Sequence, residues 1–321
     1  MRVARSLSAR EVALEEAPDP SPGPGEVVCR TLACGVCKSD VTDWYVEKKV
    51  PAVLGHELAG EVVAVGAGAA GVAVGDRVAV HHHAPCGECR RCRRGRETLC
   101  ERFRASGLDP GGFAELVRVP AELATELLAL DGLDPVAATF VEPLACVLRS
   151  QDRAGLRPGD SLLVVGAGAN GLLQIAAARA RAVEVVWARE PRPERMALAE
   201  GWGAERHGNE RVDVAIVCTP APEAIADAAA ALAPGGTLCL YAPPDPGAPL
   251  AVEGAGLFLH ELTVTASYSA GPADMRAALD LLRAGRIDPL PLVSHRVGLA
   301  ETGRALELTR AGEALKAVVV P

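Results

Sequence analysis

The sequence LLVVGAGANG, residues 162–171, decides the fold of one half of this chain. Four consecutive apolar residues are typical of a buried parallel strand, and the glycines that follow have the pattern GxGxxG. Gly166 permits a tight turn, Gly168 lets the backbone approach a pyrophosphate, and Gly171 lets a helix pack against the strand. The first N–H groups of that helix favour an anion. The stretch therefore predicts a dinucleotide-binding turn, with coenzyme contacts from Gly166, Gly168, Ala169, Asn170 and Gly171.

An acidic residue stands where such a turn would bind the ribose of its coenzyme. Glu190 follows Gly171 by 19 positions, just after the next expected strand. A carboxylate there accepts hydrogen bonds from ribose hydroxyls and repels a 2′-phosphate, which favours NAD. Arg189 and Arg192 flank Glu190 and offer positive charge to that phosphate. NAD is therefore the preferred coenzyme, and NADP stays an alternative.

Helices and strands alternate on the C-terminal side of the turn. We expect helices at 172–182, 194–201 and 223–232, and strands at 183–187, 212–218, 237–241 and 262–266. This alternation indicates an α/β fold with a doubly wound parallel sheet.

The first 120 residues have a different pattern, with short apolar strands between Gly- and Pro-rich turns. We expect strands at 27–32, 58–65, 77–81 and 113–119. This half is therefore predicted to be β-rich. After residue 268, a helix at 273–284 and a strand at 316–320 complete the chain.

Length and composition limit the class of protein. A chain of 321 residues with 49% hydrophobic residues is expected to form about two domains. No apolar run is long enough for a bilayer, and the N-terminus does not read as a signal peptide. We expect a soluble, cytoplasmic protein that binds neither membranes nor, with a net charge of −8, nucleic acid.

Four of the ten cysteines lie close together, and without a secretory signal metal binding is favoured over disulfides. Four thiolates suit a closed structural zinc site. A bacterial ferredoxin cluster would continue with x3-C-P, which is missing here, and interleaved glutamates weaken the case for a nucleic-acid-binding zinc knuckle. The proposed ligands are Cys86, Cys89, Cys92 and Cys100.

Three further motifs precede the coenzyme turn: GVCKSD at 35–40, GHE at 55–57 and VEPL at 141–144. Each is ordinary alone, but the three occur together in this order, in a β-rich half and ahead of the coenzyme turn, which is far from ordinary. A run of three histidines, His81 to His83, is interpreted as the end of a strand. Neighbouring strand residues point to opposite faces, so we expect at most one of them near the active site and favour no metal role.

Together with GHELAGE at 55–61, VGDRV at 74–78 and GGFAE at 111–115, these motifs resemble the zinc-dependent medium-chain dehydrogenase/reductase superfamily. EPLAC at 142–146 is similar to its polyol, sorbitol-type group. The resemblance implies a GroES-like catalytic domain at 1–148, a Rossmann domain at 149–268 and a return to the catalytic domain at 269–321. It also implies a homodimer or homotetramer with one catalytic and one structural zinc ion in each subunit.

The resemblance assigns the catalytic roles. Cys37 and His56 bind the catalytic zinc, and Glu142 is the third ligand or exchanges with Glu57. Asp40 fixes the tautomer of His56. Ser39 contacts the substrate oxygen and passes its proton outward.

The implied reaction interconverts a secondary alcohol or polyol with its ketone by hydride transfer to NAD(P). Two alternatives remain open: an amino-alcohol, threonine-type dehydrogenase, and a catalytically silent NAD(P)H-binding protein.

The sequence also departs from the family. Thr42 stands where many members carry a histidine that ends the proton relay. The segments between Cys37 and His56 and between Trp202 and Val212 are shorter than the family leads us to expect. The second shortening removes most of a helix and is expected either to thin one edge of the sheet or to alter how the domains close.

Overall fold

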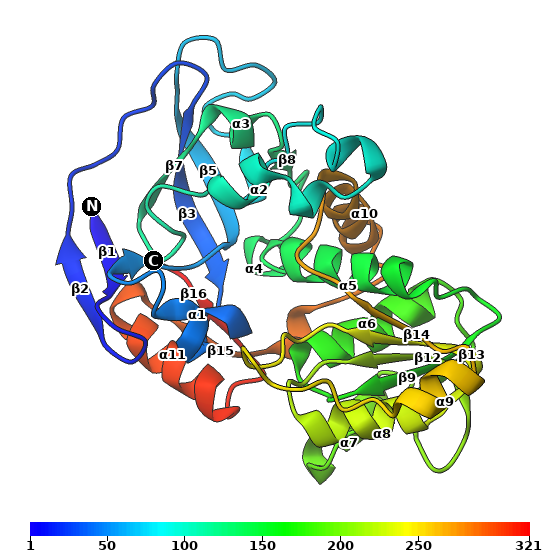
Figure 1. Cartoon of the computed structure of the whole chain (residues 1–321). Coiled ribbons are helices and arrows are strands. Elements are labelled where there is room, and N and C mark those ends of the chain that lie inside the picture. Colours follow the sequence, from blue (N-terminus) through cyan, green and yellow to red (C-terminus); the bar gives the residue numbers. More distant parts are fainter. The chain divides into compact units, whose positions relative to one another are not determined.

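The computed structural model describes all 321 residues, which form two compact units. Unit 1 comprises residues 1–143 and 271–321, and unit 2 comprises residues 144–270. Figure 1 shows strands dominating the first and a helix-covered sheet in the second. No helix in either unit combines the length and apolar character that a bilayer crossing requires.

Unit 1 is built on two sheets. In the smaller, β1 (Arg2–Ser6) pairs with β2 (Val12–Glu16) and β4 (Ala52–Val53). The larger sheet has the order β15-β16-β3-β5-β6-β8, and β7 also pairs with β3. Its strands are β3 (Val27–Gly35), β5 (Glu57–Val65), β6 (Arg77–Val80), β7 (Leu116–Val119), β8 (Leu128–Ala129), β15 (Val293–Val297) and β16 (Lys316–Val319).

The central strands of this sheet bury apolar residues because alternate side chains face the core. Val27, Cys29, Leu58 and Val62 belong to one cluster that also contains Phe113. The C-terminal strand β16 pairs antiparallel with the end of β3, and Val318 lies opposite Gly35. The last residues of the chain therefore reach the same end of the sheet as the GVCKSD motif.

Short helices connect these strands. They are η1 (Lys38–Val41), α1 (Asp43–Val46), η2 (Cys92–Arg94), η3 (Glu97–Leu99), α2 (Glu101–Ala105), α3 (Ala121–Ala124), α4 (Pro135–Ala138), α10 (Pro272–Arg283), η4 (Leu290–Leu292), η5 (Leu299–Glu301) and α11 (Thr302–Ala311).

Unit 2 has a six-stranded parallel sheet of order β11-β10-β9-β12-β13-β14. This is the strand order of a dinucleotide-binding doubly wound fold, so the predicted fold class is confirmed. The strands are β9 (Ser161–Val165), β10 (Val185–Arg189), β11 (Glu205–Arg206), β12 (Val212–Val217), β13 (Leu232–Leu240) and β14 (Thr263–Ala266).

Helices cover both faces of this sheet, with α5 and α6 on one face and α7 and α8 on the other (Figure 1). Their bounds are α5 (Val141–Ala154), α6 (Ala169–Ala180), α7 (Pro193–Gly201), α8 (Pro222–Ala230) and α9 (Gly254–Leu259). The short segment after α7 forms only β11, a strand of two residues. The edge of the sheet is therefore thin, as the sequence predicts.

Candidate active site

Strands β3 and β5 bring Cys37 and His56 to one end of the larger sheet. The strands are antiparallel and pair Gly35 with Glu57. Cys37 lies just beyond the end of β3, and His56 lies just before the start of β5. As a result, three potential ligand atoms lie within 4.8 Å of one another. They come from Cys37, His56 and Glu57, one from each residue.

The turn η1 places Asp40 beside both His56 and Cys37. Its Oδ1 lies 3.4 Å from Nδ1 of His56, and its Oδ2 accepts a hydrogen bond of 3.0 Å from the Cys37 backbone N–H. A carboxylate in this position selects the Nδ1–H tautomer and leaves Nε2 as the nitrogen for a metal. Ser39 precedes Asp40 on the same turn and is half-buried.

Negative charge is concentrated around this imidazole. Burial alone would lower the pKa of His56, but Asp40 and Cys37 raise it well above its ordinary value. Burial would raise the pKa of Asp40, but His56 and the Cys37 N–H hold it below its ordinary value. Anionic groups in a buried setting favour a cation among them, so the donor set suits a metal ion.

Glu57 forms a buried ion pair with Lys316. The side chains of Glu57 and Lys316 are only 1% and 5% exposed, and Nζ of Lys316 contacts Oε2 of Glu57. Burial would lower the pKa of Lys316, but Glu57 and Cys37 raise it. Lys316 is not among the site residues predicted from the sequence. The available signal is a single charged residue in the otherwise apolar strand KAVVV at 316–320.

Glu142 and His82 form a second group with His56. Glu142 is 7% exposed on the first turn of α5. Three potential ligand atoms, one each from His56, His82 and Glu142, are within 4.8 Å of one another. The ring centroids of His56 and His82 are 4.6 Å apart. The four residues predicted for the catalytic metal, Cys37, His56, Glu57 and Glu142, thus fall in two groups that share His56.

The three consecutive histidines do follow a strand end, because β6 stops at Val80. His82 joins a group of ligand atoms close enough to hold a metal ion, so the sequence-based preference against a metal role is least supported at this residue. Burial and the neighbouring His56 lower the pKa of His82 well below its ordinary value. His81 and His83 instead pack against Phe103, with ring centroids 5.7 and 4.7 Å away.

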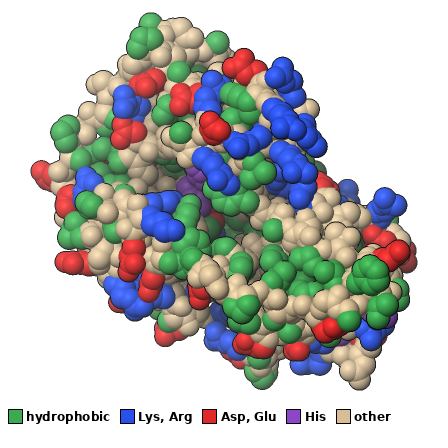
Figure 2. Space-filling model, in the orientation of Figure 1, with side chains coloured by type: hydrophobic (Ala, Val, Ile, Leu, Met, Phe, Trp, Pro, Cys, Tyr) green, Lys and Arg blue, Asp and Glu red, His purple; other side chains and the backbone are tan.

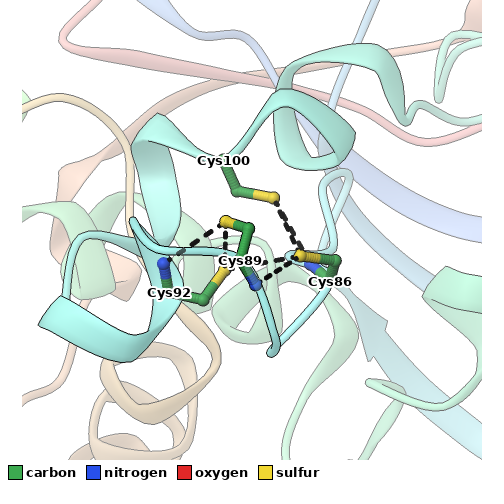
Figure 3. Close-up of side chains that lie close together, drawn as sticks. All are labelled: Cys86, Cys89, Cys92 and Cys100. Atoms are coloured by element: carbon green, nitrogen blue, oxygen red, sulfur yellow. Dashed lines mark hydrogen bonds between the residues drawn. The ribbon is translucent and has the colours of Figure 1, made fainter.

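The segment with Cys86, Cys89, Cys92 and Cys100, here called the four-cysteine lobe, brings its four sulfur atoms close together (Figure 3). Sulfur–sulfur distances are 3.8 Å for Cys86–Cys92, 3.5 Å for Cys89–Cys92 and 3.6 Å for Cys100–Cys86. A tetrahedral zinc ion with bonds of about 2.3 Å has sulfur–sulfur edges of about 3.8 Å. All four cysteines are free thiols, so the group can hold a structural zinc ion.

Backbone N–H groups support the sulfur atoms of this lobe. The N–H of Cys86 donates to Sγ of Cys100 at 3.4 Å, and the N–H of Cys89 donates to Sγ of Cys86 at 3.3 Å. The N–H of Cys92 donates to Sγ of Cys89 at 3.5 Å. Figure 2 shows Lys and Arg side chains gathered over this part of unit 1. They include the exposed residues Arg90, Arg91, Arg93, Arg94 and Arg96.

The glycine-rich turn of unit 2 has the backbone that the sequence predicts. Gly166 has φ +94°, in the region that favours glycine. A Cβ on Gly171 would lie 1.9 Å from the carbonyl oxygen of Gly166, so only glycine lets α6 begin this close to the strand. Gly168 caps α6, which starts with Ala169 and Asn170. The first turn of α6 therefore faces the space after β9 with free N–H groups.

Glu190 lies against this turn at the end of β10. Its Oε2 accepts a hydrogen bond of 2.7 Å from Ala167 N–H, and its Oε1 accepts one of 3.0 Å from Arg192 N–H. Arg189 is held by Nδ1 of His207 at 2.8 Å and by Asp227 at 3.6 Å. The acidic group is thus beside the expected pyrophosphate site, and Arg189 is engaged by other partners.

Comparisons with known proteins agree with both units. The family model of the alcohol dehydrogenase GroES-like domain matches residues 23–129, and that of the zinc-binding dehydrogenases matches residues 169–284. L-threonine 3-dehydrogenase of Pyrococcus abyssi is 34% identical over 95% of this chain and 94% of its own length. Sorbitol dehydrogenase of Bacillus subtilis is 29% identical over 100% of this chain and 97% of its own length.

A solved structure extends the likeness to three dimensions. A protein of Sinorhizobium meliloti, solved as a zinc-binding dehydrogenase bound to NADP, has a TM-score of 0.90 and 28% identity, over 100% of this chain and 99% of its own. The predicted GroES-like and Rossmann architecture is therefore confirmed. The chain belongs to the zinc-binding dehydrogenase family of alcohol and polyol dehydrogenases, enzymes that act on CH–OH groups.

Proposed function

We propose that this enzyme interconverts a secondary alcohol of a polyol-like substrate with its ketone, using NAD. Cys37, His56 and Glu142 would hold the catalytic zinc, and Cys86, Cys89, Cys92 and Cys100 the structural zinc. The observation that carries the proposal is the convergence of two donor groups on the single imidazole of His56. Sulfur, nitrogen and oxygen donors in one buried site are the set that catalytic zinc takes.

The residues named above would hold a zinc ion that would supply polarisation of the substrate oxygen, and the coenzyme would supply the hydride acceptor. The chain's own residues position these events. Asp40 would hold the His56 ring through Nδ1, at 3.4 Å in the present geometry. Lys316 would hold Glu57 near Cys37 and His56 through their ion pair. Substrate and ligands would thereby be oriented before reaction, which is a large part of an enzyme's contribution.

Ser39 is proposed to accept the proton that leaves the substrate hydroxyl. Thr42, which replaces the usual histidine, donates its hydroxyl hydrogen to the carbonyl of Lys38 at 2.9 Å. Its proton is therefore already committed to the backbone. We infer that the path beyond Ser39 runs through water or a coenzyme ribose hydroxyl.

NAD is proposed as the preferred coenzyme. Glu190 would accept hydrogen bonds from the ribose hydroxyls and repel a 2′-phosphate. Arg189 is held by His207 and Asp227, and Arg192 is paired with Glu194 at 2.7 Å, so both flanking cations are engaged by other groups. The pyrophosphate would bind at the glycine-rich turn, through the N–H groups at the start of α6.

A threonine-type dehydrogenase is the second candidate. The relative with 34% identity over 95% of this chain is a threonine 3-dehydrogenase, whereas the sorbitol dehydrogenase is 29% identical. Threonine also carries a secondary hydroxyl group, so the same zinc chemistry would serve both substrates. The two candidates differ in the groups that bind the rest of the substrate.

We further propose a cytoplasmic homodimer or homotetramer that binds neither membranes nor nucleic acid. Helix α9 exposes 82% of Phe258 and 72% of Leu259, and β14 is an edge strand of its sheet. Exposed apolar groups beside an unpaired strand favour association. Phe258→Glu should shift the mass measured by sedimentation toward the monomer, and a monomeric wild type would refute this part of the proposal.

The activity is tested with zinc-loaded protein, NAD or NADP, and a panel of sugar alcohols, cyclitols, simple secondary alcohols and threonine. The readout is the absorbance of reduced nicotinamide. We expect turnover with one class of secondary alcohol and a higher kcat/KM with NAD. If zinc and coenzyme are both bound and no member of the panel is oxidised, the proposed reaction is wrong.

A further inference from the structure

His82 has the features of a metal ligand rather than of a packing residue. It is partly buried, and its Nδ1 is buried without a hydrogen-bond partner. Buried polar atoms nearly always have a partner, so an unpaired ring nitrogen beside a metal site calls for one. The ring lies 4.6 Å from that of His56, between centroids.

The neighbouring histidines do not share this arrangement. Nδ1 of His83 lies 2.9 Å from the carbonyl oxygen of Ser106, a contact that ties its ring to the backbone. His81 also has buried ring nitrogens without a hydrogen-bond partner, but it packs edge-on to Phe103 and belongs to none of the potential metal-binding groups. Of the three histidines, only His82 belongs to the group of potential ligand atoms that includes His56 and Glu142.

The distances also suit a shared cation. Ligand atoms of His56, His82 and Glu142 all lie within 4.8 Å of one another. Donors about 2.0–2.2 Å from a zinc ion are at most about 4.4 Å apart, so a small closure brings the three groups into range. Cys37 and Glu57 form a second group of potential ligand atoms with the same His56.

We propose that His82 is a fourth protein ligand of the catalytic metal, beside Cys37, His56 and Glu142. The resting ion would then be held by two imidazoles, one thiolate and one carboxylate. This inference rests on the proposed catalytic zinc site and adds to it a ligand from the end of β6. Substrate would reach the ion by displacing one protein donor or by increasing the coordination number, which zinc permits.

The ligand count is tested by placing Co²⁺ in the catalytic site while zinc remains in the four-cysteine lobe. X-ray absorption at the cobalt edge counts imidazole ligands and detects sulfur. We expect one sulfur and two imidazoles in the wild type, and one imidazole in His82→Gln. His83→Gln is the matched control and should keep both imidazoles.

Metal release gives a second readout that does not depend on turnover. Loss of a ligand should speed the transfer of cobalt to a chelator by at least about tenfold in His82→Gln relative to His83→Gln. Zinc retained in the lobe and an unchanged circular dichroism spectrum show that each variant is folded. If His82→Gln does not fold, the wild-type imidazole count still decides.

One sulfur and a single imidazole in the wild type would overturn the inference and leave the proposed catalytic site standing. Two imidazoles in His82→Gln would also overturn it. Cobalt bound without a sulfur ligand would contradict the proposed site itself, and the inference with it.

Discussion

Lys316 and Glu57 form an ion pair inside unit 1, although 259 positions separate them in the sequence. Gly35 makes room for the pair, because a Cβ at that position would lie 2.0 Å from Oε2 of Glu57. The ammonium group of Lys316 also lies 5.5 Å from the ring centre of Phe140. Each of these buried charges compensates the other, so removing one leaves an unpaired buried charge that destabilises the fold.

Removing one partner should therefore cost far more than removing both. We expect Lys316→Met to lower the free energy of unfolding by about 3–5 kcal/mol, since Glu57 would be left as an unpaired buried charge. Adding Glu57→Gln to that variant should recover most of the loss. Denaturant unfolding of samples with matched zinc content measures both.

The exposed pair of Arg304 and Glu301, 3.7 Å apart, provides the control. Arg304→Met should change the stability by less than about 1 kcal/mol. A double variant no more stable than Lys316→Met would show that the buried charge is not the cause.

The parts of the site that the sequence predicts are those encoded by short local patterns. The strands predicted at 27–32 and 58–65 agree with β3 and β5 to within a few residues. The GVCKSD and GHE motifs lie at the ends of these strands. Residues 162–171 likewise define the turn between β9 and α6, because strand, glycines and helix are contiguous. Where chemistry and fold share one short segment, both could be predicted.

Long-range pairing explains what the sequence does not predict. The strand at 316–320 is recognisable, but its pairing with β3 depends on tertiary contacts that no local pattern encodes. Lys316 was missed for this reason. For the three histidines, alternation indicates two faces but not which face meets His56, and so His82 was not expected near a metal.

The proposed catalytic ligand Cys37 is tested by Cys37→Ala. We expect kcat/KM to fall about a thousandfold or more, because a bound metal supplies several kcal/mol of transition-state stabilisation. Zinc content should fall from two ions per chain to one, with the circular dichroism spectrum unchanged. Cys29→Ala, at another buried free cysteine of the same sheet, should keep both ions. A folded and active Cys37→Ala enzyme would remove the basis of the proposed mechanism.

The proposed structural zinc site is tested by Cys100→Ser, which should remove the other zinc ion. Cys100→Ser should lose the lobe zinc and keep the catalytic one, again leaving one ion per chain. Structural zinc contributes much of its binding free energy to folding, so the lobe at residues 86–105 should become sensitive to protease. Cys37→Ala should leave that segment resistant. Equal protection of the lobe in the two variants would mean that the four thiols hold no structural metal.

Glu190 is predicted to set the coenzyme preference. Glu190→Ala removes the carboxylate that would accept hydrogen bonds from the ribose and repel a 2′-phosphate, and it leaves Arg192 and Arg195 nearby. We expect the ratio of kcat/KM for NAD to that for NADP to fall at least about tenfold. The exposed acid Glu205 on β11 gives the control, and Glu205→Ala should leave the ratio within about twofold.

The direction of this change separates two explanations of the preference. If Glu190 acts through the ribose, NAD should bind more weakly and NADP more tightly. If its contribution is only to hold the turn through Ala167 N–H, both coenzymes should weaken together and the ratio should stay constant. A constant ratio would thus assign Glu190 to the structure of the loop, and the coenzyme preference would have to arise from other groups.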